Sequence, residues 1–176
     1  KNRTNPVEVV LAALEMLQHM KDIMYQSPSE HRIWEIRIGI DTGPVIAGVV
    51  GRNKLSYDIW GSTVNTASRM ESSGKAGQIN VSGNTFMLVS DYFDCTYRRS
   101  MPVKNKGDIK MYFVKGIKPK LSVDIKGVVP NKDFLTLLQL IRLGDLEDFI
   151  LEKLEKGLPK DLHYHNLKHT VDVYTL

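Results

Sequence analysis

Cysteine is scarce in this sequence, and proline and glycine are no more frequent than in ordinary globular proteins. Its 176 residues include one cysteine, seven prolines and 13 glycines. The single cysteine, Cys95, cannot form a disulfide within the chain, which excludes a disulfide-stapled secreted scaffold and favours a reducing, cytoplasmic setting. The lack of any excess of proline and glycine excludes collagen-like and low-complexity chains. The length suits one ordinary domain with a short extension.

Long hydrophobic runs are also missing. No apolar stretch approaches the roughly 20 residues that a membrane-spanning helix needs, and residues 1–6 do not resemble a signal peptide. We therefore expect no part of this sequence to enter a membrane, although a segment upstream of it could still provide an anchor.

Positive charge gathers in one stretch. The chain has 24 basic and 20 acidic residues, a net charge of +4, and residues 98–120 alone hold eight basic residues against Asp108. Such a stretch indicates a polyanionic partner, either nucleic acid or a nucleotide triphosphate. A solvated strand edge whose lysines discourage aggregation is an equally good interpretation.

The first 117 residues alternate between helix and strand patterns. Apolar residues recur every three or four positions over residues 7–24 and predict a helix with one buried face. Residues 34–40 alternate between apolar and polar side chains, and with the turn at 41–44 and the apolar run 45–50 they predict a hairpin. Further expected elements are a helix at 62–72 capped by Ser62 and ended by Gly74, a strand at 78–82, a helix at 84–90, and strands at 95–103 and 111–114. This alternation indicates an α/β layered domain.

The character of the chain changes after Ile117. Prolines near both ends of residues 118–130 indicate a linker. Residues 131–161 form a helical segment, in which we expect two helices, at 134–143 and 146–154, split at Gly144 with Asp145 as a cap. Another helix is expected to begin near residue 162.

Three motifs in order resemble class III nucleotidyl cyclases. They are IRIGIDTGPVIAG at residues 36–48, YDIWGSTVNTASRMES at 57–72, and VKNKG at 103–107. The resemblance implies a ferredoxin-like βαββαβ core with additions, an α+β fold, over residues 1–117. It also implies that this core is incomplete at its N-terminus. In the family, an upstream strand and hairpin supply two aspartates that bind two Mg²⁺ or Mn²⁺ ions, and a lysine that contacts the purine. We therefore expect residues 1–176 alone to be inactive.

Two residues of the second motif suit the chemistry that the resemblance implies. Cyclisation is attack of the ribose 3′-hydroxyl on the α-phosphorus, so the protein must position the nucleotide and neutralise charge on phosphate oxygens. Arg69 carries a permanently charged planar fork that can bridge those oxygens. Asn65 lies one helical turn earlier on the same face and can hold the ribose through its amide. An exposed polar face of a surface helix is the alternative interpretation.

Asp58 bears on the choice of base. A carboxylate only accepts hydrogen bonds, so it matches the amino group of adenine and opposes the carbonyl oxygen of guanine. The resemblance agrees, because adenylate cyclases commonly have Asp here and guanylate cyclases another residue such as Cys. The backbone of Ile59 would complete the contact with the purine edge. An ordinary turn residue is the alternative.

The third motif contributes cations. Lys106 resembles the lysine that grips the terminal phosphates, and Lys104 is its neighbour on the same side of an extended chain. Asn105 departs from the glycine usual in the family. A bound triphosphate would explain the basic stretch without nucleic acid. Asp41 could be mistaken for a metal ligand, but its place in the turn favours a structural role.

The tail carries a second resemblance. Residues 164–173, YHNLKHTVDV, look like the opening motif of HD-superfamily phosphohydrolases, so residues 162–176 would be the truncated start of such a domain. By resemblance His169 would be a metal ligand and His165 a proton donor. Two histidines four residues apart share one helix face and could serve one divalent transition metal. A surface histidine cluster is the alternative.

We therefore expect the C-terminal half of an adenylate cyclase domain that works as a homodimer. By resemblance two domains pair head to tail, so Asp58 and Lys106 of one chain share a site with Asn65 and Arg69 of the other. The alternatives are a catalytically silent nucleotide-binding module that regulates or dimerises, and a guanylate cyclase. A ferredoxin-like nucleic-acid binder is disfavoured, because it needs exposed aromatic residues on the sheet to stack bases and the strand positions here are mostly aliphatic.

Overall fold

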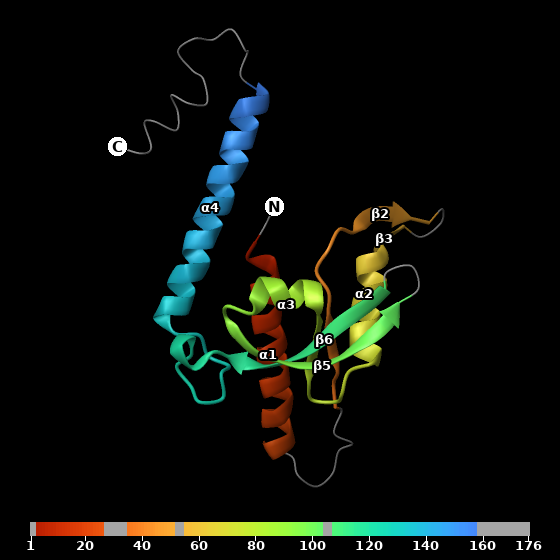
Figure 1. Cartoon of the computed structure of the whole chain (residues 1–176), viewed down its shortest axis with the longest axis vertical. Coiled ribbons are helices and arrows are strands. Elements are labelled where there is room, and N and C mark those ends of the chain that lie inside the picture. Colours follow the sequence, from red (N-terminus) through yellow and green to blue (C-terminus); the bar gives the residue numbers. More distant parts are fainter. Residues whose placement is uncertain (1–2, 27–34, 52–54, 104–106, 158–176) are drawn as a thin grey trace. The chain divides into compact units, whose positions relative to one another are not determined.

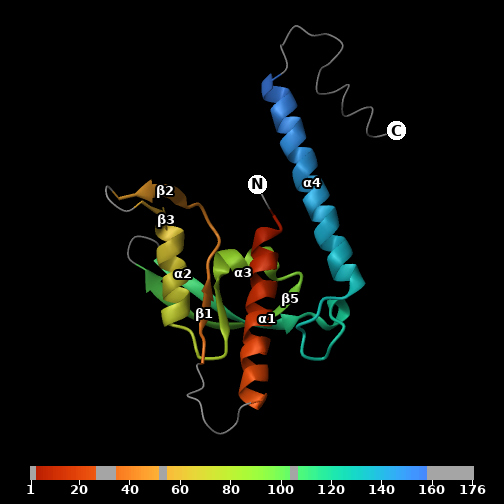
Figure 2. The ribbon, with the colours of Figure 1, turned by 180° about the vertical axis from the view of Figure 1, so that it is seen from behind.

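The computed structural model describes residues 3–26, 35–51, 55–103 and 107–157. These fall into two compact units, Asn5–Phe134 and a second unit to which residues 3–4 and 135–157 belong. The larger unit holds every strand of the described chain and the first three helices (Figures 1 and 2). Among the described helices, none is long and apolar enough to cross a membrane.

Helix α1 spans Asn5–Gln26 and confirms the predicted helix at 7–24. Its buried residues, which include Val7, Val10, Leu14 and Leu17, recur every three or four positions and form one stripe. That stripe faces the sheet, and α1 also contacts the short helix α3 at Gly83–Val89 (Figure 1). The apolar periodicity of the sequence thus decides which face of α1 is buried.

A four-stranded sheet forms the centre of the larger unit. Its strand order is β1-β4-β6-β5, with β1 at Ile38–Ile40, β4 at Ile79–Ser82, β5 at Phe93–Val103 and β6 at Gly107–Ile117. β1 and β4 are parallel, and the other two pairings are antiparallel. All four residues of β4 are buried, as expected for a central strand covered on both faces.

Helix α2, Ser62–Ser72, packs against one face of β1 and β4. Helix α1 lies on the other face of the sheet, where Leu14 and Leu17 line a cavity with Val114 of β6, the partner of Ile79 in β4. A Cβ on Gly39 would lie 2.0 Å from the backbone nitrogen of Glu71, so only a glycine in β1 lets α2 approach this closely. Asn80, which pairs with Gly39 across the strands, also faces α2. The sheet is therefore the middle layer of three.

The predicted hairpin between residues 34–40 and 45–50 is wrong. β2, Ile46–Val50, pairs instead with β3, Ser56–Trp60, in a separate two-stranded ribbon. β3 was not predicted from the sequence, and an apolar run does not by itself specify the strand with which it pairs. β1 pairs with β4 because this places its isoleucines beside the buried residues of β4. The chain between β1 and β2 is held outward by the Thr63 hydroxyl, which donates to the Pro44 carbonyl at 2.8 Å.

Ser62 does not cap α2 as predicted. It is the first helical residue, and the N-cap is Gly61, which has no side chain to donate or accept. Gly61 has φ of 141°, a value that residues with a side chain rarely adopt. The sharp change of direction from β3 into α2 therefore depends on glycine at this position.

Residues 118–131 are fixed by local hydrogen bonds. The Asp124 carboxylate accepts from the backbone N–H groups of Val128 at 3.0 Å and Val129 at 2.8 Å, and from the Ser122 hydroxyl. These hydrogen bonds lower the pKa of Asp124, and the bond from the Val129 N–H has the largest effect. Phe134 is fully buried, with its ring against the edges of Tyr92 and Phe93.

The predicted break at Gly144 is wrong. Helix α4 runs without interruption from Lys132 to Gly157. A glycine inside a helix costs only about 1 kcal/mol relative to alanine, which the helix formers around it can outweigh. Asp145 does not cap a helix, because it lies inside α4. Its carboxylate instead accepts the backbone N–H of Arg3 at 2.8 Å and pairs with the Arg3 guanidinium.

Candidate functional site

Helix α2 presents the two residues that the sequence singles out for catalysis. Asn65 and Arg69 are both exposed and lie one turn apart, whereas Thr63, Thr66 and Met70 on the opposite face are buried. The helix is thus amphipathic, with its polar stripe directed away from the sheet. Two long polar side chains at this spacing can contact one bound molecule together.

The ribbon places Asp58 and Ile59 at the surface. Both are exposed in β3, where Asp58 lies opposite Gly48 and Ile59 opposite Ala47. The Asp58 carboxylate accepts the backbone N–H of Ile59 at 2.8 Å. The two groups that we expect to contact the purine therefore bind each other here, and a base could pair with them only by replacing this contact.

Large apolar side chains on the ribbon are exposed. Tyr57 is 71% exposed and Val49 61%, and Ile46, Ile59 and Trp60 are exposed as well. An isolated two-stranded ribbon is marginally stable in water, and an apolar surface of this kind is typical of an interaction site. The ribbon that carries Asp58 is thus also a surface suited to a partner.

The two predicted phosphate-binding lysines, Lys104 and Lys106, lie outside the described residues. The strands on either side of them are described, and Val103 pairs with Gly107 where they meet. Other members of the basic stretch differ in their surroundings. Arg99 and Lys110 are exposed, whereas Arg98 is half-buried against Phe113.

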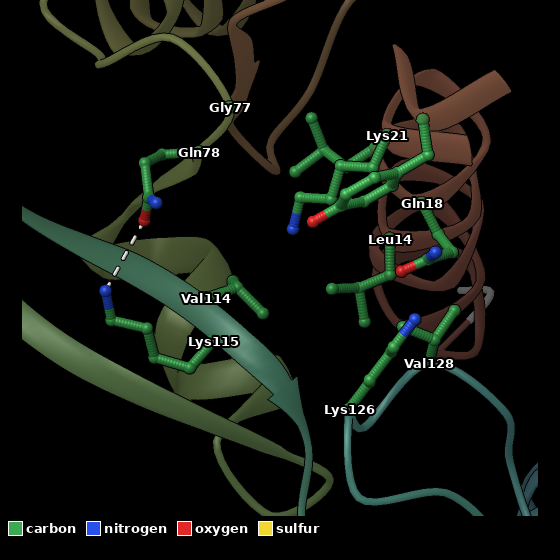
Figure 3. Close-up of a pocket in the computed structure, with 11 residues that line it drawn as sticks. Leu14, Gln18, Lys21, Gly77, Gln78, Val114, Lys115, Lys126 and Val128 are labelled. Atoms are coloured by element: carbon green, nitrogen blue, oxygen red, sulfur yellow. Dashed lines mark hydrogen bonds between the residues drawn. The ribbon is translucent and has the colours of Figure 1, made fainter. Parts of the chain in front are cut away.

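A cavity of about 460 Å³ lies between α1, the start of β4, β6 and the chain near residue 127 (Figure 3). Its apolar wall includes Leu14 and Val114, and lysines 21, 115 and 126 also line it. The Lys115 ammonium donates to the Gln78 side-chain oxygen at 3.4 Å. Among the described residues no Asp or Glu lines this cavity, and neither do Asp58, Ile59, Asn65 or Arg69. Sequence reasoning missed the cavity because its lysines come together only in the fold.

Metal ligands are absent from the described part of the chain. No group of three His, Cys, Asp or Glu side chains there could hold an ion. Asp41, which the sequence assigns a structural role, accepts a hydrogen bond of 2.5 Å from the Ser82 hydroxyl and so links the ends of the parallel strands β1 and β4. His165 and His169 lie outside the described residues.

Comparison with known proteins assigns a family to this geometry. Residues 1–116 match the family model described as the adenylate and guanylate cyclase catalytic domain. The chain is 39% identical over 123 residues to adenylate cyclase type 9 of Gallus gallus, which covers 68% of this chain and 8% of that protein. It is 42% identical over 109 residues to the germination-specific adenylate cyclase of Dictyostelium discoideum, covering 59% of this chain and 13% of that protein.

Solved structures confirm the expected fold class. The adenylyl cyclase CyaB from P. aeruginosa matches with a TM-score of 0.61 at 30% identity, over 69% of this chain and 64% of that one. The catalytic core of a rhodopsin-guanylyl cyclase with converted specificity, in complex with ATPαS, matches with a TM-score of 0.55 at 38% identity, over 62% of this chain and 58% of that one. Similar structures thus include both adenylyl and guanylyl cyclases.

Proposed function

The chain belongs to the family of adenylate and guanylate cyclase catalytic domains, and from this premise we propose that it is part of an adenylate cyclase that converts ATP to 3′,5′-cyclic AMP and pyrophosphate. The observation that carries the proposal is the exposed pair Asn65 and Arg69 on α2, beside a ribbon that presents Asp58. The chain spans 8% and 13% of the two curated relatives named above, so the activity is proposed for a longer protein.

Arg69 and Asn65 have separate tasks in this proposal. Negative charge spreads over the α-phosphate oxygens as the 3′-hydroxyl attacks and pyrophosphate leaves. The Arg69 guanidinium donates to those oxygens and stabilises the charge, and its planar fork gives two donors in fixed directions. The Asn65 amide hydrogen-bonds the ribose and holds the 3′-hydroxyl in line with the phosphorus.

Asp58 selects adenine. Its carboxylate accepts from the adenine amino group, while the backbone N–H of Ile59 donates to a ring nitrogen after release from the Asp58 carboxylate. Guanine would place a carbonyl oxygen against this carboxylate, which leaves two acceptors facing each other. Lys106, with Lys104 beside it, binds the terminal phosphates.

The divalent ions that the family uses do not fit the described residues, because these contain no cluster of carboxylates. We place the metal-binding aspartates upstream of residue 1 and assign no step of the reaction to them here. The cyclase domain is proposed to lie in the cytoplasm, as its single cysteine suggests.

A homodimer completes the site in this proposal. The exposed apolar ribbon supports it, since a second chain would cover Val49, Tyr57 and their neighbours. Asp58 and Lys106 of one chain then share a nucleotide with Asn65 and Arg69 of its partner. The tail motif with His165 and His169 is proposed to begin an HD-type metal site that later parts of the protein complete.

The test is a cyclase assay on a longer chain that includes the upstream half. It should make cyclic AMP from ATP with Mg²⁺ or Mn²⁺, whereas residues 1–176 alone should not. An Arg69→Ala variant should lose most of the activity, and Arg99→Ala, an exposed arginine of the basic stretch, should keep it. A longer chain that folds and binds ATP without turning it over would instead support the silent regulatory module.

A further inference from the structure

The last turn of α2 ends against strand β5. The final carbonyl groups of any helix have no partner within the helix and need outside donors. Ser73, the C-cap, donates its backbone N–H at 3.0 Å and its hydroxyl at 2.6 Å to the Arg69 carbonyl. The carbonyl of Ser73 itself accepts from the guanidinium of Arg98 in β5. The backbone of Arg69 and the side chain of Arg98 are thus linked through one residue.

A β-bulge directs Arg98 to this position. Along β5 and β6, Tyr97 pairs with Tyr112 and Arg99 pairs with Met111, so the ladder skips Arg98. An extra residue of this kind bends the strand and redirects a side chain. In a regular ladder Arg98 would occupy a paired position, but here its side chain reaches the end of α2.

The guanidinium of Arg98 also packs on an aromatic ring. Its guanidinium carbon lies 4.7 Å from the centre of the Phe113 ring in β6, a cation–π contact. Burial, and then the neighbouring Arg99 charge, lower the pKa of Arg98, yet an arginine stays charged at neutral pH. A fixed cation at the C-terminus of a helix is stabilising, because the exposed carbonyls carry partial negative charge.

Two other strands, β4 and β1, contact the same last turn of α2. Asn80 in β4 is fully buried and donates its amide to the Met70 carbonyl at 2.8 Å. Gly39 in β1 leaves the space that the backbone of Glu71 occupies. Residues 69–73 are therefore fixed from β1, β4 and β5. Arg98 binds the Ser73 carbonyl, and Arg37, just before β1, pairs with the Glu71 carboxylate at 2.9 Å.

We propose that Arg98 is a positioning residue, which holds the C-terminal turn of α2 so that the Arg69 guanidinium meets the α-phosphate in the transition state. The inference rests on the proposed cyclase function and adds a residue that the three sequence motifs do not contain. A displacement of about 1 Å at a reacting group can cost roughly a hundredfold in rate. Arg98 acts on the rate through Arg69 and does not touch the nucleotide.

The test compares two neighbouring arginines in the longer, active chain. Arg98→Gln should lower kcat by about tenfold to a hundredfold and leave the KM for ATP within about twofold, because ground-state binding does not depend on this turn. Arg98→Lys keeps a charged donor at the helix end and should regain a large part of the lost kcat. Arg99→Gln, one residue away and exposed, should match the wild type.

Thermal unfolding of each variant separates positioning from folding. If Arg98→Gln fails to fold, the kcat values of Arg98→Lys and Phe113→Leu test the proposal instead. Phe113→Leu keeps the Arg98 donor and removes only the aromatic ring on which it packs. A wild-type kcat in the folded variants would overturn the proposal. So would an increase in KM as large as the fall in kcat, or a lysine variant no better than glutamine. A wild-type chain without cyclase activity would refute the proposed function itself, which is a separate outcome.

Discussion

At the scale of single residues, the contact between Asp58 and Ile59 bears on the base selection that we propose for them. The carboxylate accepts the N–H of the next residue at 2.8 Å, so its acceptor is satisfied while no base is present. A ligand with a donor for the carboxylate and an acceptor for the N–H would replace this hydrogen bond with two new ones. Adenine has both groups. Sequence reasoning identified the two residues but could not predict their mutual contact, because it depends on the backbone of β3.

Replacing Asp58 tests this role. In the longer chain, Asp58→Cys should lower kcat/KM for ATP about tenfold, the value of one hydrogen bond to a charged group, and raise the relative use of GTP. The ratio of kcat/KM for ATP to that for GTP measures the change. Asp91→Asn, an exposed carboxylate elsewhere, should leave the ratio unaltered. A wild-type chain that already prefers GTP would show that the carboxylate does not select adenine.

Cys95 should be slow to react in the folded chain. Burial, together with the nearby charge of Asp94, raises the pKa of its thiol from 9.0 to about 11, against a smaller opposite effect of Lys118. The thiolate is the reactive form, so at pH 8 the folded chain should alkylate about a hundredfold more slowly than the chain in urea. The rate should climb as pH rises towards 11. Equal rates with and without urea would contradict a buried thiol.

At the scale of elements, the close approach of α2 to β1 depends on one glycine. In Gly39→Ala the new Cβ would lie 2.0 Å from the nitrogen of Glu71 and 2.6 Å from the carbonyl of Ala67, both backbone atoms that cannot rotate away. Overpacking of this kind typically costs about 1–3 kcal/mol, and moving a helix should place the cost at the upper end. Urea unfolding measures it.

Gly83→Ala is the matched control for that substitution. A Cβ at Gly83, the first residue of α3, would meet only Lys110 atoms at 3.6 and 3.7 Å, which is ordinary contact. Its unfolding free energy should stay within about 0.5 kcal/mol of the wild type. If both alanine variants were equally stable, the close approach of α2 to β1 would not depend on Gly39.

Elements with a continuous pattern were predictable, and pairings between them were not. Helix α1 and the strands β5 and β6 followed from patterns within one stretch of chain, although β6 runs over Gly107–Ile117 and is longer than the predicted 111–114. The partner of β1 did not, because the parallel pairing with β4 is formed by residues about forty positions apart in the sequence. The same holds for Arg98. It was counted as one cation of a basic stretch, and only the bulge in the folded strand directs it to α2.

At the scale of the whole molecule, the proposed sharing of one site by two chains predicts rescue between two inactive chains. A longer chain with Arg69→Ala is mixed with one carrying Lys106→Ala. If Asp58 and Lys106 of one chain work with Asn65 and Arg69 of the other, each mixed dimer has one site with both lesions and one intact site. Random pairing should restore about a quarter of the wild-type activity. Mixed dimers that form but stay inactive would show that each chain holds its own site.

Because of the exposed ribbon β2–β3, the proposed homodimer would make activity depend on the concentration of the chain. Its apolar side chains, Tyr57 and Val49 among them, are exposed. In the proposed homodimer a second chain covers them, so association and activity would obey the same law of mass action. Well below the dissociation constant of the dimer, the number of complete sites grows with the square of the chain concentration. Any upstream segment that brings two copies together would raise their effective concentration and so switch on the reaction without altering a single atom of the site.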